Sequence, residues 1–361
     1  MKTFKTAINV LFLYSYPVYF MKQLFSTIGA VLLLSVQLFA QDAALTKTLE
    51  EGKKFSDGGK FAEAASVYKK ALSKDKTNEV LNNEMSMVQL SLKNYSEAVA
   101  FSDKVIVANS KLSNQAYATK GTAQGMKGDY EEAILTFKDG INKYPDDFFL
   151  YYNLAFTQLN GSQYSHAEAS AKKAITLKSD FPASHLVLGQ AMYYQNKRVP
   201  SMLALYYFLL LEPNTPRSAQ ALSMMDQAIN LGITKEGDKI NVQIPNNEKD
   251  EFGTADVIIS LSQANRYDEK NKSKSEQQVF CESTHMLFTT LAENNKGEKK
   301  DFWWTFYVPF FSEMQKNDNV DAFCYQAMST KNNNNVNNWV RDNKSKLDKL
   351  KVWYEANYAK K

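Results

Sequence analysis

The chain repeats itself about every 34 residues between Leu45 and Asn214. The clearest copy is residues 128–145, GDYEEAILTFKDGINKYP, and residues 59–72, GKFAEAASVYKKAL, carry nearly the same pattern. A glycine, an aromatic residue and then alanines recur at fixed spacing in both copies. This kind of period predicts a unit of two helices that buries its apolar face only by stacking on the next unit. The repeat therefore predicts an all-α solenoid over about half of the chain.

Five copies of the unit can be aligned, starting near Leu45, Glu79, Asn114, Phe148 and Pro182. Their glycine, aromatic and alanine spacing resembles the tetratricopeptide repeat (TPR), whose small residues let two helices approach closely while large aromatic residues fill the space between them. The fifth copy departs from the family at residues 198–201, RVPS, where an aromatic residue and an alanine are expected. Residues 216–230 form the expected capping helix, with apolar residues on one face.

The TPR resemblance implies a protein or peptide partner, because such arrays bind other proteins and have no chemistry of their own. In the family, the first helix of each repeat lines a concave groove. The matching positions predict an aromatic, amide-rich surface with few charges, which suits an extended or helical segment with apolar side chains. The predicted groove residues are Phe149, Tyr152, Asn153, Phe156, Asn160, Val187, Gln190, Tyr193 and Tyr194.

Two alternatives for this groove stay open from the sequence. It is either free for a ligand or filled by the C-terminal region folding back onto it. A third use of the groove is not expected, because only Asn153 matches the residues with which some TPR domains hold a C-terminal carboxylate.

The C-terminal region, residues 232–361, has a different texture and is predicted to form a mainly helical domain after the repeat array of residues 45–231. One short strand or an extended arm is expected at 239–244, followed by helices at 254–265, 273–293, 301–315, 320–328 and 336–358. Residues 301–311, DFWWTFYVPFF, form the most unusual string. It is either a docking surface or, as its density of apolar residues favours, a buried helix kinked at Pro309.

The sequence predicts no catalytic, cofactor-binding or metal-binding residues. Phosphate loops and nucleophile motifs are absent from it, and Glu282 with His285 is a weak pair without a second copy. The net charge of +4 is small for 361 residues, which argues against a nucleic-acid partner. The leading hypothesis is thus a non-catalytic scaffold. The alternative is an enzyme with its active site in the C-terminal helical domain and with repeats that recruit the substrate.

The first 40 residues have the features of a targeting segment rather than of a folded domain. Met21, the expected start, is followed by Lys22 and by an apolar run from Leu24 to Phe39. These features are typical of a secretory signal peptide with cleavage after Ala40, and residues 1–20 form an upstream extension. The mature protein is therefore expected to be exported, in the periplasm, without stable insertion in the membrane.

Two cysteines occur in the chain, Cys281 and Cys324. An oxidising compartment permits a disulfide between them. Since both follow a phenylalanine in an apolar stretch, the alternative is a pair of buried thiols that pack as small hydrophobic groups.

Cleavage of the signal peptide predicts that protein recovered from the source cells begins at Gln41. Intact-mass measurement combined with N-terminal peptide sequencing checks this. A mature chain that retains residues 21–40 would instead indicate a membrane anchor.

Overall fold

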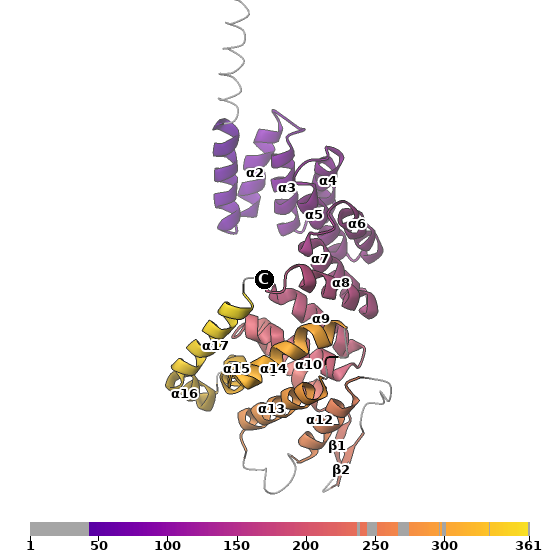
Figure 1. Cartoon of the computed structure of the whole chain (residues 1–361). Helices are drawn as coiled ribbons and strands as arrows, with labels where there is room; N and C mark the ends of the chain where they lie inside the picture. Colours follow the sequence, from indigo (N-terminus) through magenta and orange to yellow (C-terminus); the bar gives the residue numbers. More distant parts are fainter. Residues whose placement is uncertain are drawn as a thin grey trace, which may run out of the picture. The chain divides into compact units, whose positions relative to one another are not determined.

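The computed structural model describes residues 43–236, 239–243, 251–265, 274–295, 297, 301–331 and 333–359. These residues are helical apart from one short hairpin, and successive helices pack as antiparallel pairs (Figure 1). The expected all-α solenoid of helix pairs followed by a mainly helical C-terminal region is thus confirmed. The expected signal peptide and its cleavage after Ala40 lie outside the described residues. Within them, no helix has the length and apolar character needed to cross a membrane.

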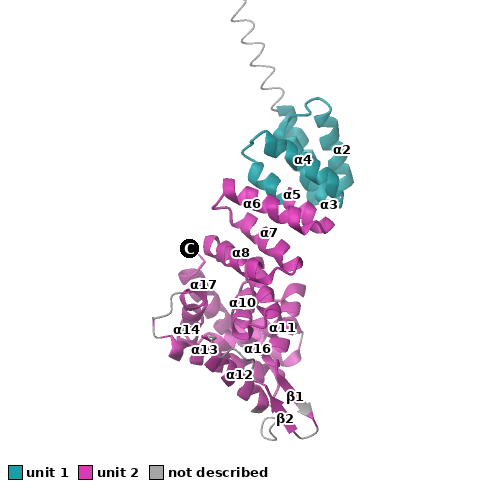
Figure 2. Ribbon diagram, turned by 90° about the vertical axis from the view of Figure 1, so that its right-hand side faces the viewer, with its two compact units in different colours: residues 1–119 teal, residues 120–361 magenta. Residues whose placement is uncertain are grey.

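The chain divides into two compact units, Met1–Thr119 and Lys120–Lys361, coloured separately in Figure 2. The first unit contains a helix at 43–57, α2 (Phe61–Leu72), α3 (Glu79–Ser91), α4 (Tyr95–Val107) and the start of α5 (Ser113–Lys127). Its core gathers around the buried Tyr68 and Met85. The expected domain boundary after Leu231 stays a prediction.

The second unit contains the remaining repeats and the whole C-terminal region. Its repeat helices are α6 (Tyr130–Lys143), α7 (Phe148–Asn160), α8 (Tyr164–Leu177), α9 (Pro182–Tyr194), α10 (Arg198–Leu211) and the capping helix α11 (Pro216–Ile229). The C-terminal elements are β1 (Ile233–Glu236), β2 (Lys239–Val242), α12 (Gly253–Asn265), α13 (Glu276–Asn294), the π-helix η2 (Trp303–Tyr307), α14 (Val308–Lys316), α15 (Val320–Met328), η3 (Ser329–Lys331), α16 (Asn334–Asp342) and α17 (Lys344–Asn357).

A left-handed residue marks the same turn in all five repeats. It stands two residues before the second helix of each pair, at intervals of 34 or 35 residues: Gly59, Lys93, Gly128, Ser162 and Asn196. Only two of the five are glycine, the residue that adopts a positive φ at no steric cost. The turn geometry is therefore fixed by the packing of the helix pair, since three of the copies keep it despite a side chain.

Close approach within a pair depends on a small residue in its first helix, which is glycine in three of the five repeats: Gly52, Gly121 and Gly189. A Cβ added at Gly121 would lie 2.5 Å from the ring of the buried Phe137, and one at Gly52 would overlap the ring of Tyr68. The expected reason for a small residue at this position is confirmed, because the aromatic side chain of the second helix fills the space that a Cβ would need.

Helix α10 explains why the fifth repeat departs from the pattern. The second helix begins with an aromatic residue in the other four repeats, at Phe61, Tyr95, Tyr130 and Tyr164, and with Arg198 in the fifth. Every residue of α10 from Arg198 to Leu210 is buried. The helix is covered on its repeat side by α9 and α11 and contacts α12, α15 and η2 of the C-terminal region. The fifth repeat is therefore adapted to hold a second layer of helices.

Arg198 makes the polar connection between these layers. Its Nε donates to Asp256 Oδ1 at 2.7 Å, and one terminal nitrogen donates to the Asp256 carbonyl oxygen at 2.6 Å and to Ser260 Oγ at 2.8 Å. The side chains of Arg198 and Asp256 are 0% and 3% exposed. A buried ion pair of this kind is stable only when further hydrogen bonds satisfy its polar atoms, and α12 supplies those bonds.

Three details of the C-terminal region differ from expectation. The expected strand pairs with β1, which the sequence analysis missed, in an antiparallel hairpin that sets Ile233 opposite Val242. The helix expected at 336–358 is broken at Asn343, a residue that favours caps over helix interiors. The kink expected at Pro309 takes the form of a π-helix: Val308 N–H donates to the Trp303 carbonyl oxygen, five residues back. Pro309 has no N–H with which to continue the α-helical pattern.

The cysteines are free thiols, and both are buried. They lie on α13 and α15, which pack together. Burial, with a further contribution from Cys281, raises the pKa of Cys324 well above its ordinary value. The structure thus shows the thiol alternative of the two that the sequence left open.

Replacing Arg198 with methionine should lower the unfolding free energy by about 3–5 kcal/mol, because it leaves the Asp256 carboxylate buried without its cation. Urea denaturation followed by circular dichroism measures this. Arg341→Met is the matched control: it removes an arginine from a pair with Asp342 whose side chains are 66% and 61% exposed, and it should leave stability nearly unchanged. Equal effects of the two substitutions would contradict the importance of the buried pair.

Candidate functional site

A row of three aromatic side chains runs along α7. Phe149, Tyr152 and Phe156, hereafter the aromatic row, recur at helical spacing on one face. The ring centroids of Phe149 and Tyr152 are 5.8 Å apart, and those of Tyr152 and Phe156 are 6.3 Å apart, with planes inclined by 33° and 27°. Phe149 is 43% exposed and Phe156 44%, while Tyr152 is half-buried. The row is thus an ordered apolar surface that water still reaches.

Phe181, which the sequence analysis did not single out, fixes the row from one side. It lies in the loop between α8 and α9, and its ring meets Tyr152 edge-on at a centroid distance of 5.0 Å and Phe149 at 6.3 Å. The available signal was an aromatic residue directly before Pro182, the first residue of α9. Edge-to-face contacts of this kind restrict the rings beyond what their buried area does.

The predicted residues on α9 fall into two groups. Tyr194 is 51% exposed and stacks on Tyr164 at 5.0 Å, and Tyr193 donates its hydroxyl hydrogen to Gln227 Oε1 at 2.8 Å. Gln190 is half-buried. Val187, in contrast, is only 3% exposed and packs in the core. Its side chain therefore supports the exposed residues of α9 from within the core.

The two predicted asparagines on α7 also differ. Asn160 is exposed at the end of the helix. Asn153 is 8% exposed, and its Nδ2 donates to the Phe149 carbonyl oxygen at 2.8 Å. The Nδ2 group of Asn153 is therefore already hydrogen-bonded within its own helix.

Helices α7 and α9 carry no aspartate, glutamate, lysine or arginine in 13 residues each. The single titratable nitrogen base among them, His185, is fully buried. Charges lie at the margin: Lys178 Nζ is 5.0 Å from the ring centroid of Phe148, Arg217 pairs with Glu212, and the Asp147 carboxylate accepts from Phe149 N–H at 2.9 Å. The face formed by the aromatic row, Gln190, Tyr193 and Tyr194, hereafter the α7–α9 face, is thus uncharged.

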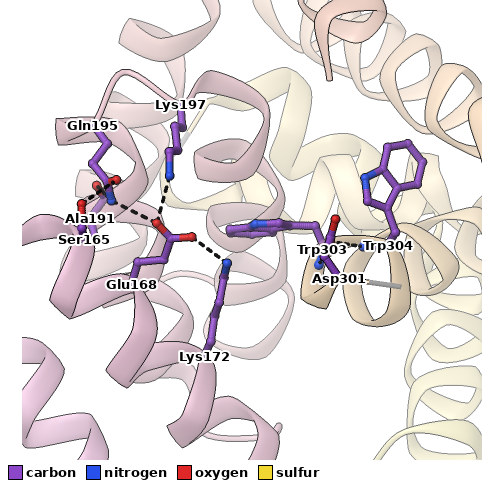
Figure 3. A network of polar contacts seen from close by, with 9 residues as sticks. All are labelled: Ser165, Glu168, Lys172, Ala191, Gln195, Lys197, Asp301, Trp303 and Trp304. Atoms are coloured by element: carbon purple, nitrogen blue, oxygen red, sulfur yellow. Dashed lines mark hydrogen bonds and ion pairs between the residues drawn. The ribbon is translucent and has the colours of Figure 1, made fainter. Parts of the chain in front are cut away.

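The C-terminal region attaches through other surfaces. Lys172 of α8 lies over the ring of Trp303 at 4.8 Å and donates to Glu168 Oε1 at 2.6 Å (Figure 3). Glu168 also accepts from Lys197 at 3.0 Å and from Gln195 at 3.3 Å. Burial raises the pKa of Glu168, but Lys172 and Lys197 outweigh it, so the pKa lies below its usual value. This network fastens η2 to the second helices of repeats four and five.

The tryptophan-rich string serves as the core of that attachment. Trp303, Trp304, Tyr307, Phe310 and Phe311 are each at most 5% exposed. Tyr307 and Phe310 meet the ring of Tyr207 on α10, at 5.7 and 4.7 Å. Of the two alternatives for this string, the structure supports the buried helix. The aromatic row instead takes its ring contacts from α7 and from the loop before α9.

His185 is held neutral where η2 meets α9. Its Nε2 lies 2.8 Å from the Ser179 carbonyl oxygen, which can only accept, so Nε2 carries the hydrogen. Its Nδ1, 2.6 Å away, consequently accepts from the hydroxyl of Tyr307. Burial, opposed by the hydrogen bond to Ser179, lowers the pKa of His185 to about 3. This histidine is thus a core residue with both ring nitrogens hydrogen-bonded.

A pocket lies where α11, α12, α13, the end of α15 and η3 meet. Its charged lining residues already have partners: Glu276 pairs with Lys331, and Asp226 accepts from Asn230. Glu282 binds Lys274 at 2.8 Å, while His285 contacts Gln315 and Asp321, so the weak pair noted in the sequence does not converge. Among the described residues, no three histidine, cysteine, aspartate or glutamate side chains gather as metal ligands would.

No family model matches this chain. An Hsp70-Hsp90 organising protein from Plasmodium falciparum is 31% identical over 97 residues, which are 27% of this chain and 38% of that relative. The chain thus spans less than two-fifths of that protein. The thermophilic TPR protein TTC0263 from Thermus thermophilus aligns at 19% identity and TM-score 0.42, over 52% of this chain and 99% of that one. A tetratricopeptide repeat protein from Parabacteroides merdae aligns at 12% identity and TM-score 0.39, over 74% of this chain and 98% of that one.

The pKa of His185 predicts a specific acid sensitivity. Between about pH 6.5 and about pH 3 the unfolded chain binds a proton at this residue and the folded chain does not. The unfolding free energy should therefore fall as pH drops through this window, by up to about 1.4 kcal/mol per pH unit from His185. His185→Gln keeps a donor and an acceptor but does not titrate, so it should lose this part of the slope in urea denaturation. His166→Gln, at an exposed site on α8, should keep it; a similar slope in all three proteins would refute the assignment.

Proposed function

We propose that the protein is an exported scaffold that binds a protein or peptide partner through the α7–α9 face and performs no covalent chemistry. The observation that carries this proposal is the aromatic row. Two of its phenylalanines keep more than two-fifths of their surface exposed on helices without a charged side chain. Exposed contiguous apolar surface of this kind marks interaction sites in soluble proteins, and aromatic residues dominate interface energetics.

The attachment of the C-terminal region supports the same proposal. That region buries its tryptophan-rich string against α8 and α10, so it does not need the aromatic row to complete its core. The 31% identical segment of an Hsp70-Hsp90 organising protein, a name that describes the assembly of other proteins, agrees with a binding role. Export to the periplasm rests on the signal-peptide pattern of residues 21–40.

An enzymatic role for the C-terminal region gains no support from the geometry of the described residues. The acid and base groups at its pocket are paired with one another or with neighbouring polar side chains. A catalytic site needs titratable groups that converge on a space where a substrate can react. The scaffold is therefore the function that the geometry favours.

The double variant Phe149→Ala with Phe156→Ala should abolish partner capture, because each truncation removes an exposed ring that a partner would bury. An affinity pull-down of residues 41–361 from an envelope extract, quantified by mass spectrometry, compares the variant with wild type. Leu135→Ala is the control, since Leu135 is 62% exposed and belongs to another helix, α6. Both variants should keep the thermal midpoint close to that of wild type. Equal capture by the double variant and wild type would place the binding surface elsewhere.

A further inference from the structure

The chemistry of the α7–α9 face restricts the conformation of the segment that it takes. We infer that the aromatic row receives an α-helix of the partner, with aliphatic side chains at three- and four-residue spacing and no charge on the docked face. This inference rests on the proposed function and specifies its ligand. Three independent properties of the face lead to it.

The first property is the spacing of the rings. The centroids of the aromatic row follow one another at 5.8 and 6.3 Å, with planes inclined by about 30° to one another. Side chains four residues apart on an α-helix are separated by a rise of about 6 Å. A helix lying along α7 therefore offers one side chain to each gap between rings. A polyproline segment repeats only every 9.3 Å or so, which spans more than one gap.

The second property is the lack of partners for an extended backbone. A bound strand needs hydrogen-bond partners for its own N–H and C=O groups, which the edge of a sheet supplies and the side of a helix does not. Amide side chains could replace that edge only if they were available. Asn153 is buried and bonded to Phe149, and Gln227 already accepts from Tyr193. That leaves Gln190 on α9 and Asn160 at the end of α7, two amides on different helices rather than a continuous edge. A helix forms its backbone hydrogen bonds internally, so its N–H and C=O groups need no partners on this surface.

The third property is charge. Because α7 and α9 bear no charged side chain, and the Asp147 carboxylate beside Phe149 already accepts from its N–H, a lysine or glutamate docked against the rings would lose hydration with little gain from ion pairing. Arg217, whose charge acts on Tyr152, is already paired with Glu212 and so offers a carboxylate little attraction. The docked face of the partner is therefore apolar, and its charged residues lie on the opposite face of its helix.

Selection from a random peptide library tests the conformation directly. Peptides about 16 residues long, enough for four helical turns, are displayed on phage, selected on the intact protein and depleted on the Phe149→Ala/Phe156→Ala variant. The expected winners carry aliphatic residues at positions i, i+3 or i+4, and i+7. They should bind wild type and Leu135→Ala alike and bind the double variant about 30-fold more weakly, gain helical circular dichroism on binding, and lose affinity when a central residue becomes proline.

Each other outcome has its own meaning. Winners that depend on the row but alternate apolar and polar residues, or are rich in proline, would overturn the helix and leave the proposed function standing. Winners that end in an essential acidic carboxyl terminus would do the same. If no selected peptide distinguishes wild type from the double variant, the row is not a docking surface, and both the helix and the proposed function fail.

Discussion

The structure of the second unit depends on the complete burial of α10. An ordinary second helix of a repeat keeps one face in water, whereas α10 is enclosed from Arg198 to Leu210. Enclosure is possible because the C-terminal helices supply a second layer, and Arg198 with Asp256 provides the polar contact that fixes its position. An alternative layer that left this guanidinium unpaired would bury a lone charge, which costs several kcal/mol. The buried pair thus selects one arrangement of the layers.

This attachment determines which surface remains for a partner. The C-terminal region contacts α8 through Trp303 and α10 through Tyr307 and Phe310, and it reaches α9 through the buried His185. The rings of α7 contribute nothing to that core except the partly buried Tyr152. The apolar residues of the chain are accordingly separated into a set that joins the two layers and a smaller set that stays accessible.

The sequence predicted what the repeat period controls and missed what long-range contacts control. The helix pairs, the cap at 216–229 and the close approach at Gly121 follow from local spacing, and all are confirmed. The residues 198–201 were recognised as a departure, but their purpose depends on Asp256, 58 positions away, which no local pattern reveals. The site residues stay predictions as a set. Their burial, as for Val187, and the contribution of Phe181 depend on contacts between elements that the period does not encode.

The order of the aromatic row bears on how well it can bind. A flexible apolar side chain loses rotamer freedom when a partner fixes it, at about 0.5–1.5 kcal/mol for each rotamer-rich side chain. Tyr152 and Phe149 have already lost much of that freedom, because Phe181 meets both rings and the row packs ring to ring. The free-energy cost of ordering these rings is therefore incurred when the repeats fold rather than when a partner binds. A surface prepared in this way can bind tightly with few rings, provided that the partner's helix is already held in shape within its own protein, because a short isolated helix is only marginally stable in water.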